Sequence, residues 1–257
     1  MPEVLVEDKG RARYLTLNRP EKRNALNDAL VSKLKEELLA ANEVESLRAI
    51  VIRGAGNDFC SGADLSALQK IANASFEENL DDARSLADLM AIPRSMNVPV
   101  IAAVHGRALA GGCGLATACD LVVAATSARF GYPEVKIGFV PAIVLAFLRR
   151  SVGEKTAFEL TTQGFEFTAE KALDLGIINK CFPDESFEID LLEYVSIYEK
   201  VSKSAVQLSK RLLYEMDSRS FNDAIEIGSR MNAEARMTSD CQHGIRRFLE
   251  KADSKST

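Results

Sequence analysis

Two glycine-containing loops are the first segments of this 257-residue sequence whose residues could do chemistry. Residues 59–65 read FCSGADL and residues 108–116 read ALAGGCGLA, and each loop follows a predicted strand. Glycine lets the backbone approach a ligand oxygen closely, and free amides at the start of a helix favour developing negative charge. Taken alone, each loop is equally consistent with an ordinary tight turn.

Glu134 is a candidate for moving a proton. It ends the segment FGYPE at residues 130–134, shortly after a predicted strand. A carboxylate that is partly buried against an apolar pocket has a raised pKa, because desolvation disfavours the charged form, and such a group can accept and return protons. The alternative is a solvent-facing loop glutamate.

Two other patterns in the second loop would indicate different chemistry. Residues 112–114 approximate the start of a dinucleotide-binding G-x-G-x-x-G, but the preceding strand is predicted to end near Val104 and Thr117 takes the third glycine position. Cys113 with His105 would form a thiol nucleophile and its base. Small apolar neighbours instead favour a buried packing cysteine, so both interpretations are disfavoured.

The elements that must position these residues alternate between strand-like and helical patterns, which is typical of a layered α/β architecture. Asn27 offers an N-cap for a helix with Leu30, Leu34, Leu38 and Leu39 on one face. Strands are predicted at residues 4–6, 13–17, 49–52, 99–104, 121–125 and 177–181. Further helices are predicted at residues 77–96, 142–149, 154–162 and 169–175.

The C-terminal part has helical spacing from residue 204 to residue 251. The residues expected on one face of its last helix are Cys241, Ile245, Phe248 and Leu249. We therefore divide the chain into an α/β core, residues 1–190, and a helical C-terminal oligomerisation region, residues 191–257. The sequence has no internal repeat and no low-complexity linker.

The composition is that of an ordinary globular protein, with 47% hydrophobic and 27% charged residues. Lys and Arg number 32 against 37 Asp and Glu, so the chain lacks the global basic field of a general nucleic-acid binder. Five cysteines without a C-x-x-C pair and two histidines indicate reduced thiols and no zinc site. No signal-peptide pattern and no long apolar run is present, so we expect a cytoplasmic protein without a membrane segment.

Several segments occur in an order that is typical of one enzyme family. They are LNRPEKRNALN at 17–27, SGADL at 61–65, AGGCGLATACDL at 110–121, FGYPE at 130–134 and GIRRFLEK at 244–251. Together they resemble the enoyl-CoA hydratase/isomerase (crotonase) family over nearly the whole chain. The resemblance implies an α/β fold with a crotonase-like ββα spiral core and a helical C-terminal region.

The resemblance also implies roles for individual residues. The main-chain amides of Ala63 and Gly111 would bind the thioester oxygen, and Glu134 would be the general acid/base. Losing one such amide donor typically lowers a rate by about 10²–10³-fold. The implied substrate-binding residues are Lys22, Arg23, Ala25, Ser61, Asp64, Leu65, Phe248 and Lys251. Among these, the cations are equally consistent with solvated surface charges.

Gly114 is the main departure from the family pattern, because hydratases with two catalytic glutamates carry one of them at this position. Two glutamates hold and polarise the water that adds to the double bond, whereas moving a double bond needs one proton carrier. The single Glu134 therefore favours isomerisation. Hydration through a rearranged water site is the alternative, with Asp64 as a substitute carboxylate. Ala142 stands where dienoyl-CoA isomerases of the family carry an aspartate, which argues against that activity.

The implied partner is an acyl-CoA thioester, and no metal or redox cofactor is expected because coenzyme A is part of the substrate. The resemblance implies a homotrimer or a dimer of trimers in which the terminal helix reaches a neighbouring subunit's site. Residues 141–147, PAIVLAF, would line the acyl pocket or form a buried helix. The alternative from another class is a non-catalytic acyl-CoA- or RNA-binding protein, although the intact amide loops and Glu134 favour catalysis.

Overall fold

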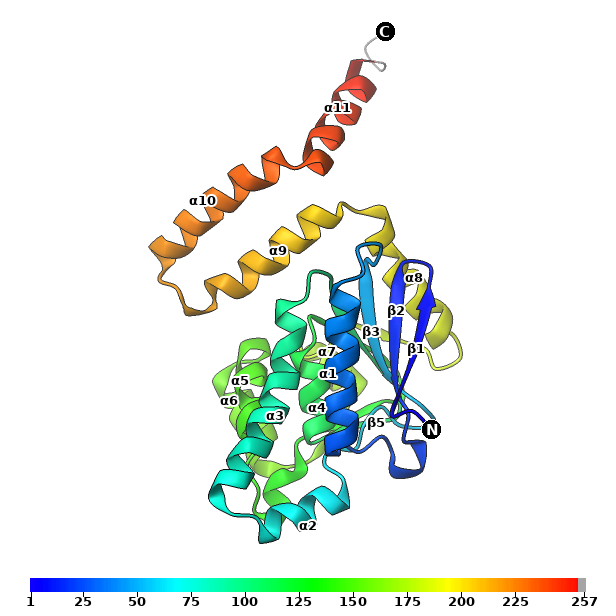
Figure 1. The fold of residues 1–257 in the computed structure, drawn as a ribbon, viewed down its shortest axis with the longest axis vertical. Helices are drawn as coiled ribbons and strands as arrows, with labels where there is room; N and C mark the ends of the chain where they lie inside the picture. Colours follow the sequence, from blue (N-terminus) through cyan, green and yellow to red (C-terminus); the bar gives the residue numbers. More distant parts are fainter. Residues whose placement is uncertain (254–257) are drawn as a thin grey trace.

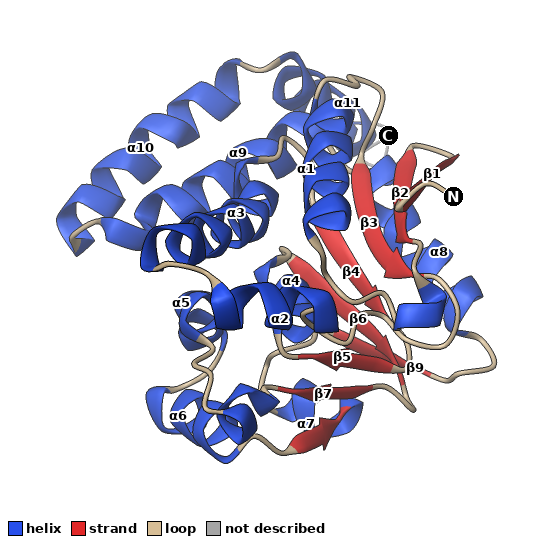
Figure 2. Cartoon of the chain, turned by 60° about the horizontal axis from the view of Figure 1, so that its bottom comes forward, coloured by secondary structure: helices blue, strands red, loops and turns tan. Residues whose placement is uncertain are grey.

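A six-stranded sheet forms the centre of the computed structural model, which describes residues 1–253 (Figure 2). Its strand order is β1-β2-β3-β4-β6-β9, and every neighbouring pair except the β1–β2 hairpin is parallel. The strands are β1 Val4–Lys9, β2 Ala12–Leu17, β3 Ala49–Gly54, β4 Val100–Val104, β6 Leu121–Ala125 and β9 Lys180–Phe182. The central strands are buried runs of Val, Ile and Ala, as expected of parallel strands that are covered on both faces.

Helices cover the two faces of this sheet in different ways. The larger core packs one face against α1 Asp28–Asn42, α3 Phe76–Ser95 and α4 Gly111–Ala118. The opposite face packs against α8 Phe187–Lys200, which buries every fourth residue of one stripe, Phe187, Leu191 and Val195. The layered α/β core that the sequence predicts is confirmed.

A second, three-stranded sheet lies where the polypeptide leaves the central sheet. It pairs β5 Arg107–Leu109, β7 Arg129–Gly131 and β8 Glu166–Thr168 in that order. The remaining elements are η1 Pro20–Lys22, α2 Leu65–Asn73, η2 Pro133–Ile137, α5 Ala142–Ser151, α6 Glu154–Gln163, α7 Ala169–Asp174, α9 Lys203–Glu215, η3 Met216–Ser218, α10 Phe221–Met237 and α11 Ser239–Asp253. The small sheet places α4 and η2 side by side.

The C-terminal helices extend from the body at the end of the molecule opposite α2 (Figure 1). The first of them, α9, is held to the body by a buried cluster in which Asp120 accepts hydrogen bonds from Lys210 Nζ at 2.6 Å and the Tyr214 hydroxyl at 2.6 Å. The predicted boundary at residue 190 falls inside α8. Because α8 packs on the sheet, the separate helical region begins after Lys200.

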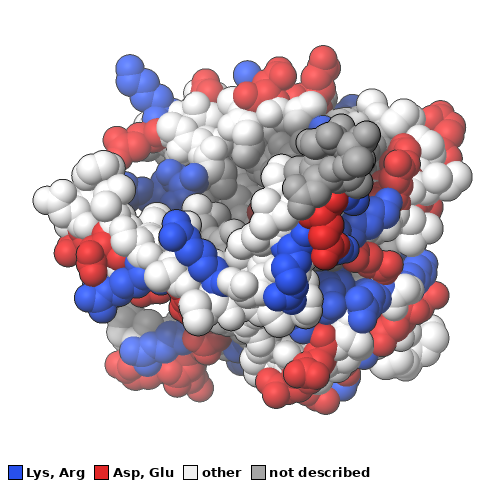
Figure 3. Space-filling model, turned by 90° about the horizontal axis from the view of Figure 1, so that it is seen from above, with Lys and Arg blue, Asp and Glu red and all other residues white. Residues whose placement is uncertain are grey.

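The surface carries mixed charge. On the face seen in Figure 3, Lys and Arg side chains lie interspersed with Asp and Glu. Among the helices of residues 1–253, none is long and apolar enough to cross a bilayer. The expectation that the protein does not bind nucleic acid rests on composition alone and stays a sequence-based prediction.

Candidate active site

The amide of Ala63 is left free by the way its loop pairs with the N-terminal segment. The Leu26 amide donates to the Gly62 carbonyl at 2.7 Å, and the Asp64 amide donates to the Leu26 carbonyl at 2.9 Å. Successive amides of an extended chain point to opposite sides, so the Ala63 N–H points away from Leu26. Ala63 is exposed, and its N–H has no acceptor among the described residues.

The amide of Gly111 is presented by a strained residue. Ala110 has φ 49° and ψ −127°, a conformation that L-residues rarely adopt, and its own amide donates to the Gly131 carbonyl at 2.8 Å. Such a residue costs about 1–3 kcal/mol and persists when its surroundings fix it. Gly111 is the first residue of α4, so its N–H has no partner within the helix and faces outward with the positive end of the helix dipole.

The two loops lie directly against each other. A Cβ atom placed on Gly62 would lie 2.8 Å from the Ala110 Cβ and 3.5 Å from the Gly111 nitrogen. A Cβ on Gly112 would lie 2.2 Å from the Cys60 carbonyl oxygen. Glycine is therefore required at both positions for the loops to approach. Two unpaired main-chain donors are brought together in this way, which can stabilise one oxyanion.

The position of Glu134 is set by the small sheet. The β5–β7 pairing sets Gly131 against Leu109, and Glu134 follows three residues later in η2. The residue is 9% exposed, and its Oε2 atom is buried without a partner in the described chain. Burial raises the pKa of the Glu134 carboxyl. The burial of Glu134 that the sequence predicts is confirmed. A buried carboxylate with an oxygen that has no partner can accept a proton.

Apolar side chains fill the space beside Gly114. A Cβ on this glycine would lie 2.4 Å from Val144 Cγ2 and 2.9 Å from Met90 Cε. Val144 comes from α5 and is 4% exposed, and Met90 comes from α3 and is fully buried. Val144 of α5 therefore packs on the core, and no carboxylate side chain fits at residue 114 while α5 holds this position. The lining of an acyl pocket by residues 141–147 stays a prediction.

The remaining predicted residues near the loops differ in exposure. Lys22 and Arg23 are exposed beside the first loop, and Arg23 accepts a hydrogen bond from the Ser61 amide at 3.0 Å. Ala25 is buried next to Leu26, and Leu65 begins α2. The part that these residues would take in binding a ligand stays a prediction.

Asp64 has a structural role. Its Oδ1 accepts hydrogen bonds from the Ser66 amide and hydroxyl, both at 2.9 Å, and its Oδ2 accepts one from Arg19 at 2.7 Å. These hydrogen bonds, first from the Ser66 amide and then from Arg19, lower the pKa of Asp64 to about 2. The carboxylate caps α2 and is a weak base, so it does not offer a second proton carrier.

Phe248 and Lys251 are not brought to the amides within one chain. Both lie on α11, at the end of the long axis opposite α2 (Figure 1). Phe248 is 75% exposed, and Ile245 and Leu249, which belong to the same predicted apolar face of α11, are also exposed. A contact between this face and a bound ligand would need a second copy of the chain.

Cys113 and His105 do not form a catalytic pair. Cys113 is fully buried, and burial raises the pKa of its thiol to about 12. The His105 ring nitrogen Nε2 lies 2.9 Å from the Gly56 carbonyl oxygen. A protonated, buried thiol is a poor nucleophile. The prediction of a packing cysteine is confirmed.

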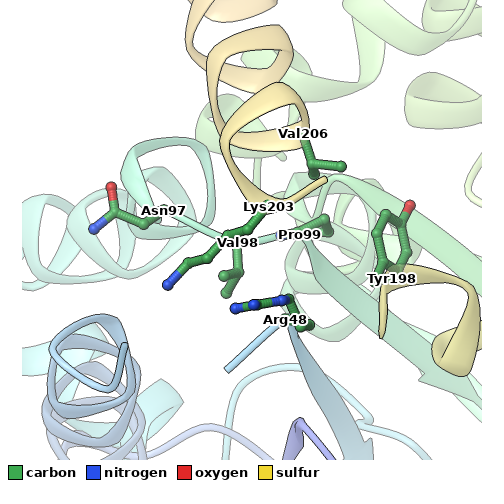
Figure 4. A pocket seen from close by; sticks show the side chains of 7 residues that line it. All are labelled: Arg48, Asn97, Val98, Pro99, Tyr198, Lys203 and Val206. Atoms are coloured by element: carbon green, nitrogen blue, oxygen red, sulfur yellow. The ribbon is translucent and has the colours of Figure 1, made fainter. Parts of the chain in front are cut away.

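A small cavity lies at the amino ends of β3 and β4, away from the carboxyl ends that lead to the amide loops (Figure 4). Its two cations are committed to the chain, because Arg48 and Lys203 both donate to the Glu45 carbonyl. The lining residues are Arg48, Asn97, Val98, Pro99, Tyr198, Lys203 and Val206. No group of three His, Cys, Asp or Glu side chains that could hold a metal occurs within residues 1–253.

Comparison with known proteins now identifies the family. The family model described as enoyl-CoA hydratase/isomerase matches residues 8–256. The chain belongs to the enoyl-CoA hydratase/isomerase family. Among curated members of this family, the 2,3-dehydroadipyl-CoA hydratase of Escherichia coli is 36% identical, with 98% of this chain and 97% of that protein covered.

Other members of the enoyl-CoA hydratase/isomerase family agree in sequence and in structure. The mitochondrial enoyl-CoA hydratase domain-containing protein 3 of Xenopus laevis is 31% identical over 97% of this chain and 84% of that protein. A crystal structure of an enoyl-CoA hydratase from Mycobacterium smegmatis superposes with a TM-score of 0.93 at 32% identity, covering 98% of this chain and 97% of that chain. The crotonase fold expected from the resemblance is confirmed.

Proposed function

We propose that this member of the family is an enoyl-CoA isomerase that moves a carbon–carbon double bond next to a thioester. The amides of Ala63 and Gly111 would hold the thioester oxygen. Glu134 would remove the proton at C2, so that charge accumulates on that oxygen, and would return a proton at C4. The double bond between C3 and C4 thereby moves to the position between C2 and C3, and no atom is gained or lost.

The filled space beside Gly114 is the observation that carries this proposal. Adding water requires groups that hold and deprotonate the water, whereas Val144 and Met90 present only carbon and sulfur there. Asp64 cannot substitute, because both of its oxygens are engaged. Glu134 therefore remains as the carboxylate that the resemblance assigns to proton transfer, with a buried oxygen that has no partner in the described chain, and one carboxylate is sufficient for carrying a proton between two carbons.

Hydration is the second candidate, because the named relatives include hydratases. Purified protein should be incubated with 2-enoyl-CoA and 3-enoyl-CoA esters. Isomerisation converts the 3-enoyl ester into a conjugated ester of unchanged mass, which gains ultraviolet absorbance. Hydration gives a product heavier by one water. Efficient water addition by the unmodified protein would overturn the preference for isomerisation.

Glu134→Gln tests the assigned proton carrier. Turnover should fall by at least about 10²-fold, in line with the loss of a positioned general base. Glu159→Gln, an exposed glutamate on α6, is the matched control and should keep full turnover. Full activity in Glu134→Gln would remove this residue from the mechanism. Retained binding of acyl-CoA without turnover in the unmodified protein would support the non-catalytic alternative.

We further propose a homotrimer or a dimer of trimers, without a metal or redox cofactor. Large apolar side chains on the C-terminal helices support assembly, since Phe221, Met237 and Phe248 are each at least 75% exposed in the single chain. Light scattering during size exclusion measures the mass directly, and a monomer would refute this part. A cytoplasmic location stays a prediction; one named relative is mitochondrial.

A further inference from the structure

Arg19 is a largely buried cation that contacts the Ala63 loop through Asp64, and the proposed reaction does not use it. Its side chain is 13% exposed. Nη1 donates to the Ala25 carbonyl at 2.5 Å, Nη2 donates to Asp64 Oδ2 at 2.7 Å, and Nε lies 3.3 Å from Glu3 Oε2. With these contacts satisfied inside the chain, the guanidinium is not a free phosphate ligand.

Two of these contacts join the Ala63 loop to the segment that pairs with it. Ala25 precedes Leu26, whose amide and carbonyl bond the residues on either side of Ala63. Asp64 follows Ala63 and fixes the start of α2 through Ser66. One planar guanidinium therefore bridges the two strands of chain that set the direction of the Ala63 N–H.

We infer that Arg19 is a positioning residue for the oxyanion site: by clamping the Ala25 carbonyl and the Asp64 carboxylate, it holds the Ala63 amide at the angle needed to donate to a thioester oxygen. This inference rests on the proposed function for its effect on turnover. The binding geometry that it describes also holds for an unreactive thioester.

The geometry explains why lysine cannot replace Arg19. Lysine carries a single ammonium group on a flexible stem, whereas the arginine fork reaches two acceptors in fixed directions. Arg19→Lys keeps the charge and loses the clamp. A small misplacement of a catalytic group can cost about 10²-fold, and loss of an oxyanion donor about 10²–10³-fold. We expect kcat to fall by about 10- to 100-fold while KM changes by less than about 3-fold.

The experiment compares Arg19→Lys with Arg13→Lys. Arg13 also forms a two-point pair, with Asp8 at 2.7 and 2.8 Å, but it lies on the β1–β2 hairpin. Besides kcat and KM, the infrared carbonyl band of bound butyryl-CoA, labelled with ¹³C at the carbonyl, reports polarisation of the thioester without any turnover. In Arg19→Lys the band should move back towards that of the free ester, and Arg13→Lys should leave both the band and kcat unchanged.

Asp64→Asn provides an independent variant. Its amide oxygen can still accept the Ser66 N–H and cap α2, but its NH₂ group cannot accept from Arg19. A loss of kcat and a band shift in the same direction are expected, and the double variant should be no worse than Arg19→Lys alone, because both substitutions break the contact between Arg19 and Asp64. If Arg19→Lys does not fold, the kcat and the carbonyl band of Asp64→Asn test the positioning role of Arg19.

An unchanged carbonyl band and an unchanged kcat in these folded variants would overturn the positioning role. Absence of turnover in the unmodified protein, with a band that still shifts on binding and responds to Arg19→Lys, would refute the isomerase proposal and leave this inference standing. The two failures are thus distinguishable.

Discussion

Substituting Gly114 by alanine tests whether the space beside this residue is filled as described. The added Cβ would lie 2.4 Å from Val144 Cγ2, far inside the ordinary carbon–carbon contact distance. Gly228 in α10 is a matched helical glycine. A Cβ there would meet only Met216 Cε at 3.6 Å, which is ordinary contact.

The magnitudes follow from two opposing effects. Alanine is about 0.8–1 kcal/mol better than glycine inside a helix, and this gain applies to both substitutions. Overpacking a buried site typically costs about 1–3 kcal/mol, and this cost applies only at Gly114. Gly228→Ala should therefore stabilise the protein slightly. Gly114→Ala should be less stable than Gly228→Ala by about 1–3 kcal/mol.

Thermal unfolding at fixed protein concentration measures this difference. For a chain of this length, about 1 kcal/mol corresponds to roughly 2–4 °C in Tm. Adding Val144→Ala removes the clashing methyl groups, so Gly114→Ala should be tolerated in that background. The double-mutant cycle should give a favourable coupling energy of about 1–3 kcal/mol.

An equal gain in stability at Gly114 and Gly228 would refute the reasoning. It would mean that α5 yields without cost, so that Val144 is no barrier to a side chain or to water at this position. The structural support for isomerisation over hydration would then be lost, although Glu134 and the two amides would be unaffected.

Three further predictions concern buried charge. Glu134→Gln should raise the free energy of unfolding at pH 7 by about 1 kcal/mol in urea titrations, because it replaces a buried carboxylate, whose charge is disfavoured by burial, with a neutral amide. Burial raises the pKa of Glu134, so this group destabilises the unmodified protein as pH rises and the carboxyl ionises. The extra stability of Glu134→Gln should therefore vanish near pH 4, where the carboxyl is protonated in both the folded and the unfolded protein. The kcat of the unmodified protein should rise with pH through the raised pKa of Glu134. Asp64, whose pKa is lowered to about 2 chiefly by the Ser66 amide, stabilises the fold above about pH 4 and loses this effect as pH falls towards 2, so Asp64→Ala should flatten acid unfolding there. Asp120→Ala leaves the buried Lys210 ammonium without a charged partner and should cost about 3–5 kcal/mol, with faster amide hydrogen exchange in α9.

Local signals in the sequence were sufficient for many elements. Asn27 caps α1 as predicted, with its side chain accepting from the Leu30 amide at 2.9 Å. The strand predicted at 121–125 coincides with β6, and the helix predicted at 154–162 with most of α6. Capping and apolar periodicity act within a few residues, so a single sequence contains them.

Elements that depend on distant partners were missed or misplaced. The three-residue strands β5, β7 and β8 have too few residues for a pattern, and they exist because of their pairing with one another. The strand predicted at 177–181 was wrong in position. Ile177 and Ile178 are buried in the core within a turn, and β9 begins only at Lys180. Both positions are isoleucine because they are buried, and two adjacent isoleucines are also typical of a strand, which is why the sequence predicted one here.

The candidate site was only partly readable in advance. The glycines and Glu134 were recognisable because the resemblance spans several motifs. The strained Ala110, the Val144 side chain beside Gly114 and the clamp by Arg19 required coordinates, since each joins residues far apart in the sequence. The two free amides themselves belong to no particular side chain.

That last property has a consequence for genetic screens. A saturation library changes side chains, and both proposed thioester donors are peptide groups that survive every substitution except proline. Activity would therefore be lost on substitution of neighbours such as Gly62 and Gly112, where any Cβ atom would push the two loops apart. Locating the donors themselves calls for chemical synthesis, in which a single amide at Ala63 or Gly111 is exchanged for an ester oxygen.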